Sequence, residues 1–232
     1  MIQLKMTLKY CIAFYLVIML YSSLHELVHH FSAYFICGDW GTKSFNYFST
    51  ACADDDATQY IATYMGPLFT YIMMYVGMYF MRDSSSNHSK HLGFAIVFAQ
   101  LPFQRITGPI MGYNDEYYVV AKLYGGSFGL QLLMTILLLA ICLPPLIRAF
   151  KVIGNKRKWL WYSWYFLLFP YLLWGPFFGG LEYLMVNRGF LNQQVIGIGL
   201  LFIINEFVTI AGHLFTKNWI SAHEEVENKI GG

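Results

Sequence analysis

Charged side chains are scarce in this sequence. Only 12% of the 232 residues are Asp, Glu, Lys or Arg, whereas 57% are hydrophobic and 19% are aromatic. A typical soluble domain carries about a quarter charged residues. The composition therefore indicates a chain built for a lipid bilayer, and no polar stretch is long enough to form a separate soluble domain.

An excess of one charge sign and a framework of cysteines are lacking as well. The formal net charge is +2, and the basic residues stand in short loops rather than along one face, which excludes nucleic-acid binding. The four cysteines show no CxxC spacing, so neither a disulfide framework nor a thiolate metal site is indicated. Cys37 and Cys52 are the one pair that could bond.

Long apolar stretches are what the sequence does contain. A hydrocarbon core about 30 Å thick needs about 20 apolar residues per helix. We therefore predict an all-α polytopic protein, integral to the membrane, with about six transmembrane helices and a short strand-like loop over residues 38–57 after the first helix. The predicted spans are residues 8–36, 58–81, 91–112, 128–149, 159–184 and 194–214.

The third of these stretches is apolar but broken. Irregular backbone at membrane depth persists only where protein or a water-filled cavity satisfies its polar groups, so we expect this segment to line a polar pocket. The breaking and polar residues are Gln100, Pro102, Arg105, Gly108, Pro109 and Gly112.

The first predicted span carries the motif His25-Glu26-Leu27-Val28-His29, which matches H-E-x-x-H. On a helix, two histidines four residues apart project from one face, so one metal ion can take both imidazoles. Glu26 is then placed to take a proton from a metal-activated water and to return it to a leaving amine. The alternative is a polar cluster at the membrane interface.

A catalytic zinc site needs a third protein ligand and an open position for water. Asp115 is the candidate, because it begins a helix directly after the broken segment. The alternative is a capping role, since Asn114 and Asp115 are both favoured at helix N-termini.

Three ordered blocks of the sequence resemble the site-2 protease family of intramembrane zinc metalloproteases. The first block is the apolar helix ending in His25-Glu26-Leu27-Val28-His29-His30-Phe31-Ser32-Ala33, followed by a short strand-like loop. The second, Tyr64-Met65-Gly66-Pro67-Leu68, is similar to the family's G-P-L element. The third runs from Phe98-Ala99-Gln100-Leu101-Pro102 to Asn114-Asp115 and resembles its F-N-L-L-P and D-G stretch. The blocks cover a little over half of the chain.

The resemblance implies a zinc metalloendopeptidase that hydrolyses peptide bonds of transmembrane or membrane-associated polypeptides. Zn²⁺ would be held by His25, His29 and Asp115, with Glu26 as the catalytic base. Residues 1–125 would form the metalloprotease core, residues 126–216 additional transmembrane helices, and residues 217–232 a polar tail. Three positions depart from the family pattern: Thr70, Gln100 and Glu116.

Two other functions remain open at this stage. One is a membrane protein that keeps a metal for structure or transport, with His30 as a spare ligand. The other is a homologue whose motif has lost its activity. Retention of Glu26 favours hydrolysis, because a purely structural metal site has no use for it.

Other polar residues in the predicted spans have a structural and a functional interpretation. Asn205, Glu206 and His213 would be costly facing lipid, so we expect a hydrogen-bond network inside the bundle rather than substrate gating. Arg105 is expected to pair with Asp115 or Glu116, and its alternative role is to stabilise an oxyanion.

The distribution of basic residues predicts an orientation. With six spans, one side of the membrane receives eleven of the Lys and Arg residues and the other receives Lys43, Lys122 and Arg188. The positive-inside rule then places both termini in the cytoplasm and the HExxH end of the first helix on the opposite face. The resemblance implies the reverse orientation. A cysteine at Ser49 is therefore expected to be labelled from outside, and one at Asn155 is not.

Overall fold

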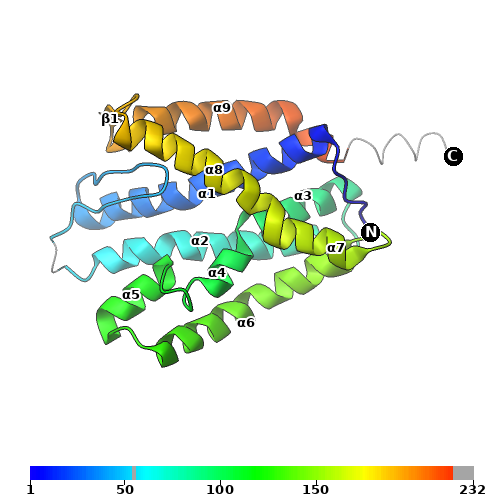
Figure 1. The fold of residues 1–232 in the computed structure, drawn as a ribbon, viewed down its shortest axis with the longest axis horizontal. Helices are drawn as coiled ribbons and strands as arrows, with labels where there is room; N and C mark the ends of the chain where they lie inside the picture. The colour runs from blue at the N-terminus through cyan, green and yellow to red at the C-terminus, as the bar shows by residue number, and fades with distance from the viewer. Residues whose placement is uncertain (54–55, 222–232) are drawn as a thin grey trace.

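Helices make up most of the computed structural model, which describes residues 1–53 and 56–221. Figure 1 shows them lying roughly side by side along the long axis of the molecule. The helices are α1 (Leu8–Cys37), α2 (Gln59–Phe80), α3 (Asn87–Ala99), α4 (Pro102–Thr107), α5 (Asp115–Tyr124), α6 (Phe128–Val152), α7 (Lys158–Ser163), α8 (Phe169–Glu182) and α9 (Leu200–Thr216). Shorter elements are the π-helical turns η1 (Trp164–Leu168) and η2 (Tyr183–Asn187), the strands β1 (Gln194–Val195) and β2 (Ile198–Gly199), and the 3-10 turn η3 (Lys217–Ile220).

Three helical stretches in the described residues are long and apolar enough to cross a membrane: α1, α6 and the α9–η3 stretch Leu200–Ile220. The predicted helical class is therefore confirmed, whereas six spans stay a prediction. Two of the other predicted spans are broken rather than continuous. One is divided between α3 and α4, and the other runs through α7, η1 and α8.

The break between α3 and α4 follows from two adjacent residues. Leu101 has a positive φ of 51°, and Pro102 starts α4. Proline lacks the N–H that would continue the hydrogen-bond ladder of α3, so the chain turns here and restarts as a new helix. The predicted irregular segment is thus confirmed, and it sets the direction in which α4 carries Arg105.

Aromatic side chains form the packing core between α1, α3 and η1. The ring centroids of Phe14 and Phe94 lie 6.2 Å apart, those of Phe14 and Tyr165 lie 4.7 Å apart, and those of Phe94 and Phe98 lie 4.6 Å apart. All four side chains are fully buried. Aromatic pairs at such distances stabilise a core beyond the area they bury, so α3 is held firmly against α1 although it is short.

The basic segments gather at one end of the molecule, on the right in Figure 1. The N-terminal stretch pairs with the α6–α7 turn, where Ile2 N–H donates to Val152 O at 2.8 Å. Arg148 at the end of α6 binds Asp83 of the α2–α3 turn at 2.7 Å. Lys9 lies over the Trp219 ring of η3. The charge clustering predicted for one side therefore corresponds to one physical end of the fold.

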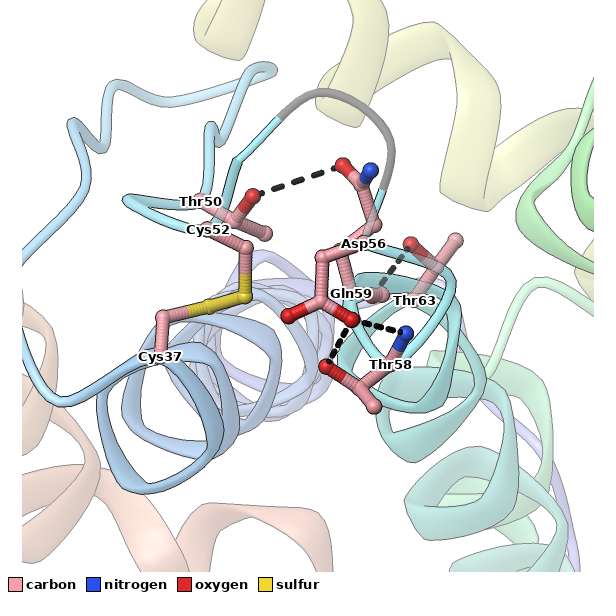
Figure 2. Close-up of a disulfide and its surroundings, with 7 residues drawn as sticks. All are labelled: Cys37, Thr50, Cys52, Asp56, Thr58, Gln59 and Thr63. Carbon is pink, nitrogen blue, oxygen red and sulfur yellow. Dashed lines mark hydrogen bonds between the residues drawn. A yellow bond between two sulfur atoms is a disulfide. The ribbon is translucent and has the colours of Figure 1, made fainter.

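The loop after α1 lies at the other end and is closed by a disulfide between Cys37 and Cys52 (Figure 2), with a Cα separation of 4.8 Å. These are the two cysteines that the sequence analysis named as the one pair that could bond. The predicted strand-like character is limited to isolated bridges that pair Lys43 with Phe48 and with Ile198.

Of the acidic run 54–56 in this loop, residues 54 and 55 lie outside the described residues. Asp56 accepts hydrogen bonds from the backbone and the hydroxyl of Thr58 at 2.8 and 2.7 Å, and these bonds lower the pKa of its carboxyl.

The last predicted span begins later than expected. Residues 194–199 form a hairpin in which Gln194 pairs with Gly199 and Val195 with Ile198, so α9 starts only at Leu200. The turn has positive φ at Ile196 and Gly197, a conformation that a helix does not contain. The predicted polar tail starts as η3, and residues 222–232 lie outside the described residues.

Candidate metal centre

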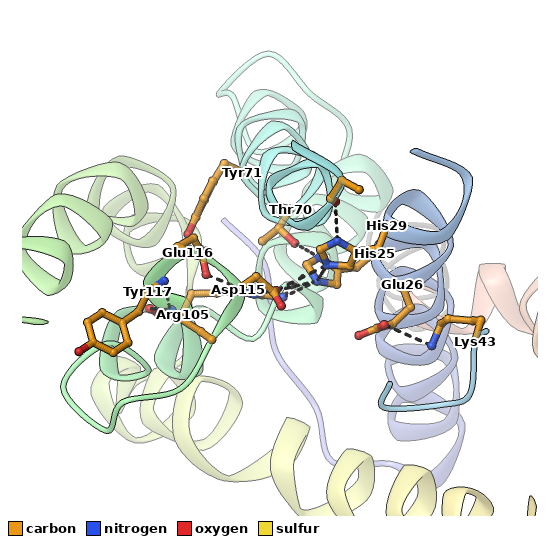
Figure 3. A network of polar contacts seen from close by, with 12 residues as sticks. His25, Glu26, His29, Lys43, Thr70, Tyr71, Arg105, Asp115, Glu116 and Tyr117 are labelled. Carbon is orange, nitrogen blue, oxygen red and sulfur yellow. Dashed lines mark hydrogen bonds and ion pairs between the residues drawn. The ribbon is translucent and has the colours of Figure 1, made fainter. Parts of the chain in front are cut away.

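The helical spacing of the HExxH motif brings two histidines together on the inner face of α1. His25 and His29 are 5% and 1% exposed, and their Nε2 atoms lie 3.0 Å apart. Both rings point toward α2 and α5 rather than toward solvent (Figure 3). The two predicted ligands on α1 are thus adjacent and buried, as a shared ion requires.

The third predicted ligand, Asp115, comes from the first position of α5. Asn114 occupies the N-cap, where its side chain accepts a hydrogen bond from Tyr117 N–H at 3.0 Å. The capping role therefore belongs to Asn114, and the carboxylate of Asp115 is turned toward the histidines. Its Oδ2 lies 3.3 Å from His25 Nε2 and 3.6 Å from His29 Nε2.

These three ligand atoms have the spacing of a zinc site. Zinc bonds of about 2.0 to 2.1 Å in tetrahedral geometry place the ligand atoms about 3.3 to 3.4 Å apart. The observed separations of 3.0, 3.3 and 3.6 Å bracket that value. His25, His29 and Asp115 are also the one group of three potential metal ligands that the described part of the chain brings together.

The far nitrogens of both rings have partners that fix their orientation. His29 Nδ1 donates to Ala62 O at 2.9 Å, since a carbonyl oxygen can only accept, so in the neutral ring the lone pair is on Nε2. His25 Nδ1 lies 2.9 Å from Thr70 Oγ1. Metal-binding histidines commonly have such outer partners. Thr70, a departure from the family pattern, thus holds one of the two rings.

The tight approach of α2 to His29 depends on Gly66. A Cβ at this position would lie 2.5 and 2.6 Å from His29 Cε1 and Cδ2, well inside carbon contact distances of about 3.5 to 4.0 Å. The glycine of the second sequence block is therefore required by the position of a predicted ligand.

Arg105 on α4 bridges two of the candidate ligands. Its Nη1 lies 2.9 Å from Asp115 Oδ2, and its Nη2 lies 2.9 Å from His25 Nε2. The expected salt bridge is therefore present. The hydrogen bond to His25 uses the lone pair that a metal ion would need, so Nη2 must leave Nε2 for the ion to be bound.

Glu116 follows the candidate ligand Asp115 and is another of the three positions that depart from the family pattern. It is a partner of Arg105 rather than a metal ligand. Its carboxylate is buried, accepts a hydrogen bond from the Tyr71 hydroxyl and lies 3.7 Å from Arg105 Nη1. Tyr71 therefore holds the Glu116 carboxylate, which pairs with the guanidinium through Nη1.

Glu26 lies beside the histidines and lines a cavity of about 330 Å³ together with His25, Arg105 and Asp115. This volume is at the lower end of the range for ligand sites, about 300 to 1,000 Å³. The third departure, Gln100, also lines the cavity. Apolar and small residues of the loop and of α8 complete the wall: Phe45, Gly175, Phe178 and Gly179.

Lys43 is the site residue that the sequence analysis missed. Its Nζ lies 3.2 Å from Glu26 Oε2 (Figure 3). Lysine in a loop is ordinary, and no spacing links residue 43 to the motif. Only the folded loop shows that the two side chains meet.

The positions of His30 and Glu206 test two further expectations from the sequence. His30 points to the hairpin, where its Nε2 lies 2.9 Å from Ile196 O and its ring stacks on Trp40, so it is not a spare ligand. Glu206 accepts hydrogen bonds from Ser23 at 2.6 Å and from Asn205 at 3.1 Å. The bond from Ser23 ties α9 to α1, as expected for a structural network. The expected third member, His213, does not join it, because its buried Nδ1 has no hydrogen-bond partner among the described residues.

Comparison of the chain with models of known protein families, with curated proteins and with solved structures finds no match. The interpretation of the site therefore depends on its own residues and geometry.

Proposed function

We propose that this protein is a membrane-embedded zinc peptidase, similar in its chemistry to the site-2 proteases. The observation that carries the proposal is the ligand triangle of His25 Nε2, His29 Nε2 and Asp115 Oδ2, whose sides of 3.0 to 3.6 Å fit one zinc ion. Glu26 follows the first ligand in the chain and faces the same cavity.

A zinc ion held there supplies a Lewis acid and an acidified water. The chain's own groups do the rest. Glu26 takes the proton of the attacking water and delivers it to the leaving nitrogen. Asp115 and the two rings hold their positions through Asn114, Ala62 and Thr70. Arg105, held by Glu116, lies where its guanidinium can donate to a developing oxyanion once it has left His25.

The proposed setting is the lipid bilayer, with the chain crossing it six times and cleaving transmembrane or membrane-associated polypeptides. Support comes from α1, α6 and the α9–η3 stretch, each long and apolar enough to span. The broken segments α3–α4–α5 and α7–η1–α8 also join opposite ends of the molecule in Figure 1. Broken helices of this kind are tolerated at membrane depth where they line a cavity, and both contribute to the cavity wall.

Two independent observations support an orientation with the metal centre in the non-cytoplasmic half. The basic residues of the N-terminus, the α2–α3 turn and the α6–α7 turn lie together at the end away from the HExxH motif. The Cys37–Cys52 disulfide closes the loop at the other end, and disulfides persist in oxidising compartments. Both arguments oppose the orientation that the family resemblance implies.

A second function is favoured by one observation, the hydrogen bond from Arg105 Nη2 to His25 Nε2. If the guanidinium takes the place of a metal ion, the cluster is a salt-bridged core and the protein is an inactive homologue. A metal-binding protein with a structural or transport role is the intermediate case.

Metal analysis and one substitution separate these functions. Purified protein should hold about one zinc per chain, and His25→Ala, His29→Ala and Asp115→Ala should each lower the occupancy. Glu26→Gln should keep the zinc and lower cleavage of quenched-fluorescent hydrophobic peptides in proteoliposomes by about 100-fold or more. Asp39→Asn, an exposed carboxylate of the neighbouring loop, is the matched control.

Absence of zinc in the wild type would favour the salt-bridged homologue. Full zinc occupancy with cleavage equal in Glu26→Gln and wild type would remove Glu26 from the chemistry.

A further inference from the structure

Lys43 is a fully buried cation. Its side chain has no exposed surface, although it stands in the loop between α1 and α2. A buried charge is costly unless it is paired and hydrogen-bonded. Its burial therefore needs a compensating set of partners.

The ammonium group has one acceptor for each of its three N–H donors. Glu26 Oε2 lies 3.2 Å away, Tyr47 O lies 3.5 Å away, and the carbonyl of Ser44 is also bonded. The ring of Phe202 on α9 covers the group, with its centroid 5.0 Å from Nζ. Glu26 is the one charged partner in this set.

The backbone around Lys43 is fixed independently of Glu26. Lys43 N–H donates to Gly197 O at 2.7 Å, and Gly199 N–H donates to Lys43 O at 3.2 Å, so the hairpin holds the residue from both sides. Glu182 at the end of α8 accepts from Ser44 Oγ at 2.7 Å and from Phe45 N–H at 2.8 Å. These hydrogen bonds therefore fix the loop backbone that carries Lys43, whether or not Glu26 is bound to it.

We infer that Lys43 is a positioning residue for the catalytic base, an inference that rests on the proposed function. By holding Oε2 of Glu26, it fixes the carboxylate in one rotamer and leaves the other oxygen to face the cavity. A glutamate side chain has three rotatable bonds, and catalysis suffers when a reacting group is not held in its productive geometry. The loop, the hairpin and α8 thus act on the reaction through one contact.

Cobalt(II) tests this without a known substrate. Unlike zinc, cobalt absorbs visible light, and its spectrum responds to the groups around its open coordination position. Cobalt-loaded Lys43→Met should show a shifted spectrum at unchanged cobalt content. The same substitution in a Glu26→Ala background should produce no further shift, because that background has no side-chain oxygen for Lys43 to hold. Lys122→Met, an exposed lysine at the same end of the fold, is the control and should match the wild type.

Kinetics supply the second readout. In proteoliposomes with the quenched-fluorescent peptides, Lys43→Met should lower kcat by about 10- to 100-fold, the range for loss of an outer partner in a metal site. KM should stay within about twofold, because Lys43 does not line the cavity.

A further variant covers the case in which Lys43→Met fails to fold. Glu182→Gln weakens the hydrogen bonds that anchor Ser44 and Phe45 but keeps Lys43 itself. It should therefore shift the cobalt spectrum in the same direction as Lys43→Met, by a smaller amount.

The outcomes separate the two claims. Cobalt bound by the wild type, with spectra and kcat unchanged in both Lys43→Met and Glu182→Gln, would overturn the positioning role and leave the metal centre intact. Failure of the wild type to bind cobalt or zinc would instead refute the proposed function, and with it this inference.

Discussion

Replacing Gly66 by alanine tests the metal centre through a residue that is not a ligand. The new Cβ would lie 2.5 Å from His29 Cε1 and 2.6 Å from Cδ2. Since carbon atoms pack at about 3.5 to 4.0 Å, the ring must retreat by about 1 Å or α2 must move away from α1. Either shift is several times the ±0.2 Å tolerance of a zinc bond.

The expected loss is at least about 100-fold in zinc affinity, or about 2.7 kcal/mol. Helix propensity acts in the opposite direction, because alanine is better than glycine in a helix interior by about 1 kcal/mol. A weaker site in a helix of higher propensity would therefore report the displacement of His29 and not a general loss of structure.

Competition with a chelator of known affinity measures this change, with helical content followed by circular dichroism. Gly129→Ala in α6 is the matched control, because a Cβ at that position meets open space. Wild-type zinc affinity in Gly66→Ala would refute the placement of His29 against α2.

Three further predictions test the surroundings of the site. Thr70→Val removes the hydroxyl 2.9 Å from His25 Nδ1 at nearly constant volume, and titration calorimetry should show about 10- to 100-fold weaker zinc binding. In a background that lacks Cys11 and Cys142 but keeps the loop disulfide, a cysteine at exposed Tyr47 should react with an impermeant maleimide on intact cells and one at exposed Lys156 should not; labelling of the Lys156 site alone would support the family orientation. The hydrogen bond and charge of Arg148 lower the pKa of Asp83, so this pair stabilises the fold above the ordinary carboxyl pKa and loses its effect as the pH falls through the lowered value. Asp83→Asn should therefore lower Tm slightly near neutral pH and leave it unchanged in acid, the effect being small because the carboxylate is exposed.

Two of the three candidate ligands could be predicted from local sequence alone. His25 and His29 share a helical face through their four-residue spacing alone. Asp115 needed the order of three sequence blocks, because its approach to α1 is a long-range contact. Its alternative as a helix cap was excluded only when Asn114 proved to be the cap.

The contact of Lys43 with Glu26 could not be predicted, because it depends on how the loop folds back, whereas Cys37 and Cys52 were named as the one pair of cysteines that could bond. The contact of Lys43 with Glu26 requires the hairpin at residues 194–199, which contacts the loop from the far part of the chain. The sequence predicts a helix from residue 194, so it does not predict this hairpin. The turn at Ile196 and Gly197 shows only in the backbone angles.

The anchoring of the loop by α8 and the hairpin implies an order of assembly. Chains fold from the N-terminus as they are made, and all three proposed ligands have been synthesised once α5 begins at Asp115. The groups that hold Lys43 in place, Glu182, Gly197 and Gly199, come much later. In a growing chain, the three proposed ligands would therefore be available before the groups that position Lys43 against Glu26. Under the proposed function, the full catalytic rate would be reached only after the final third of the chain has been made.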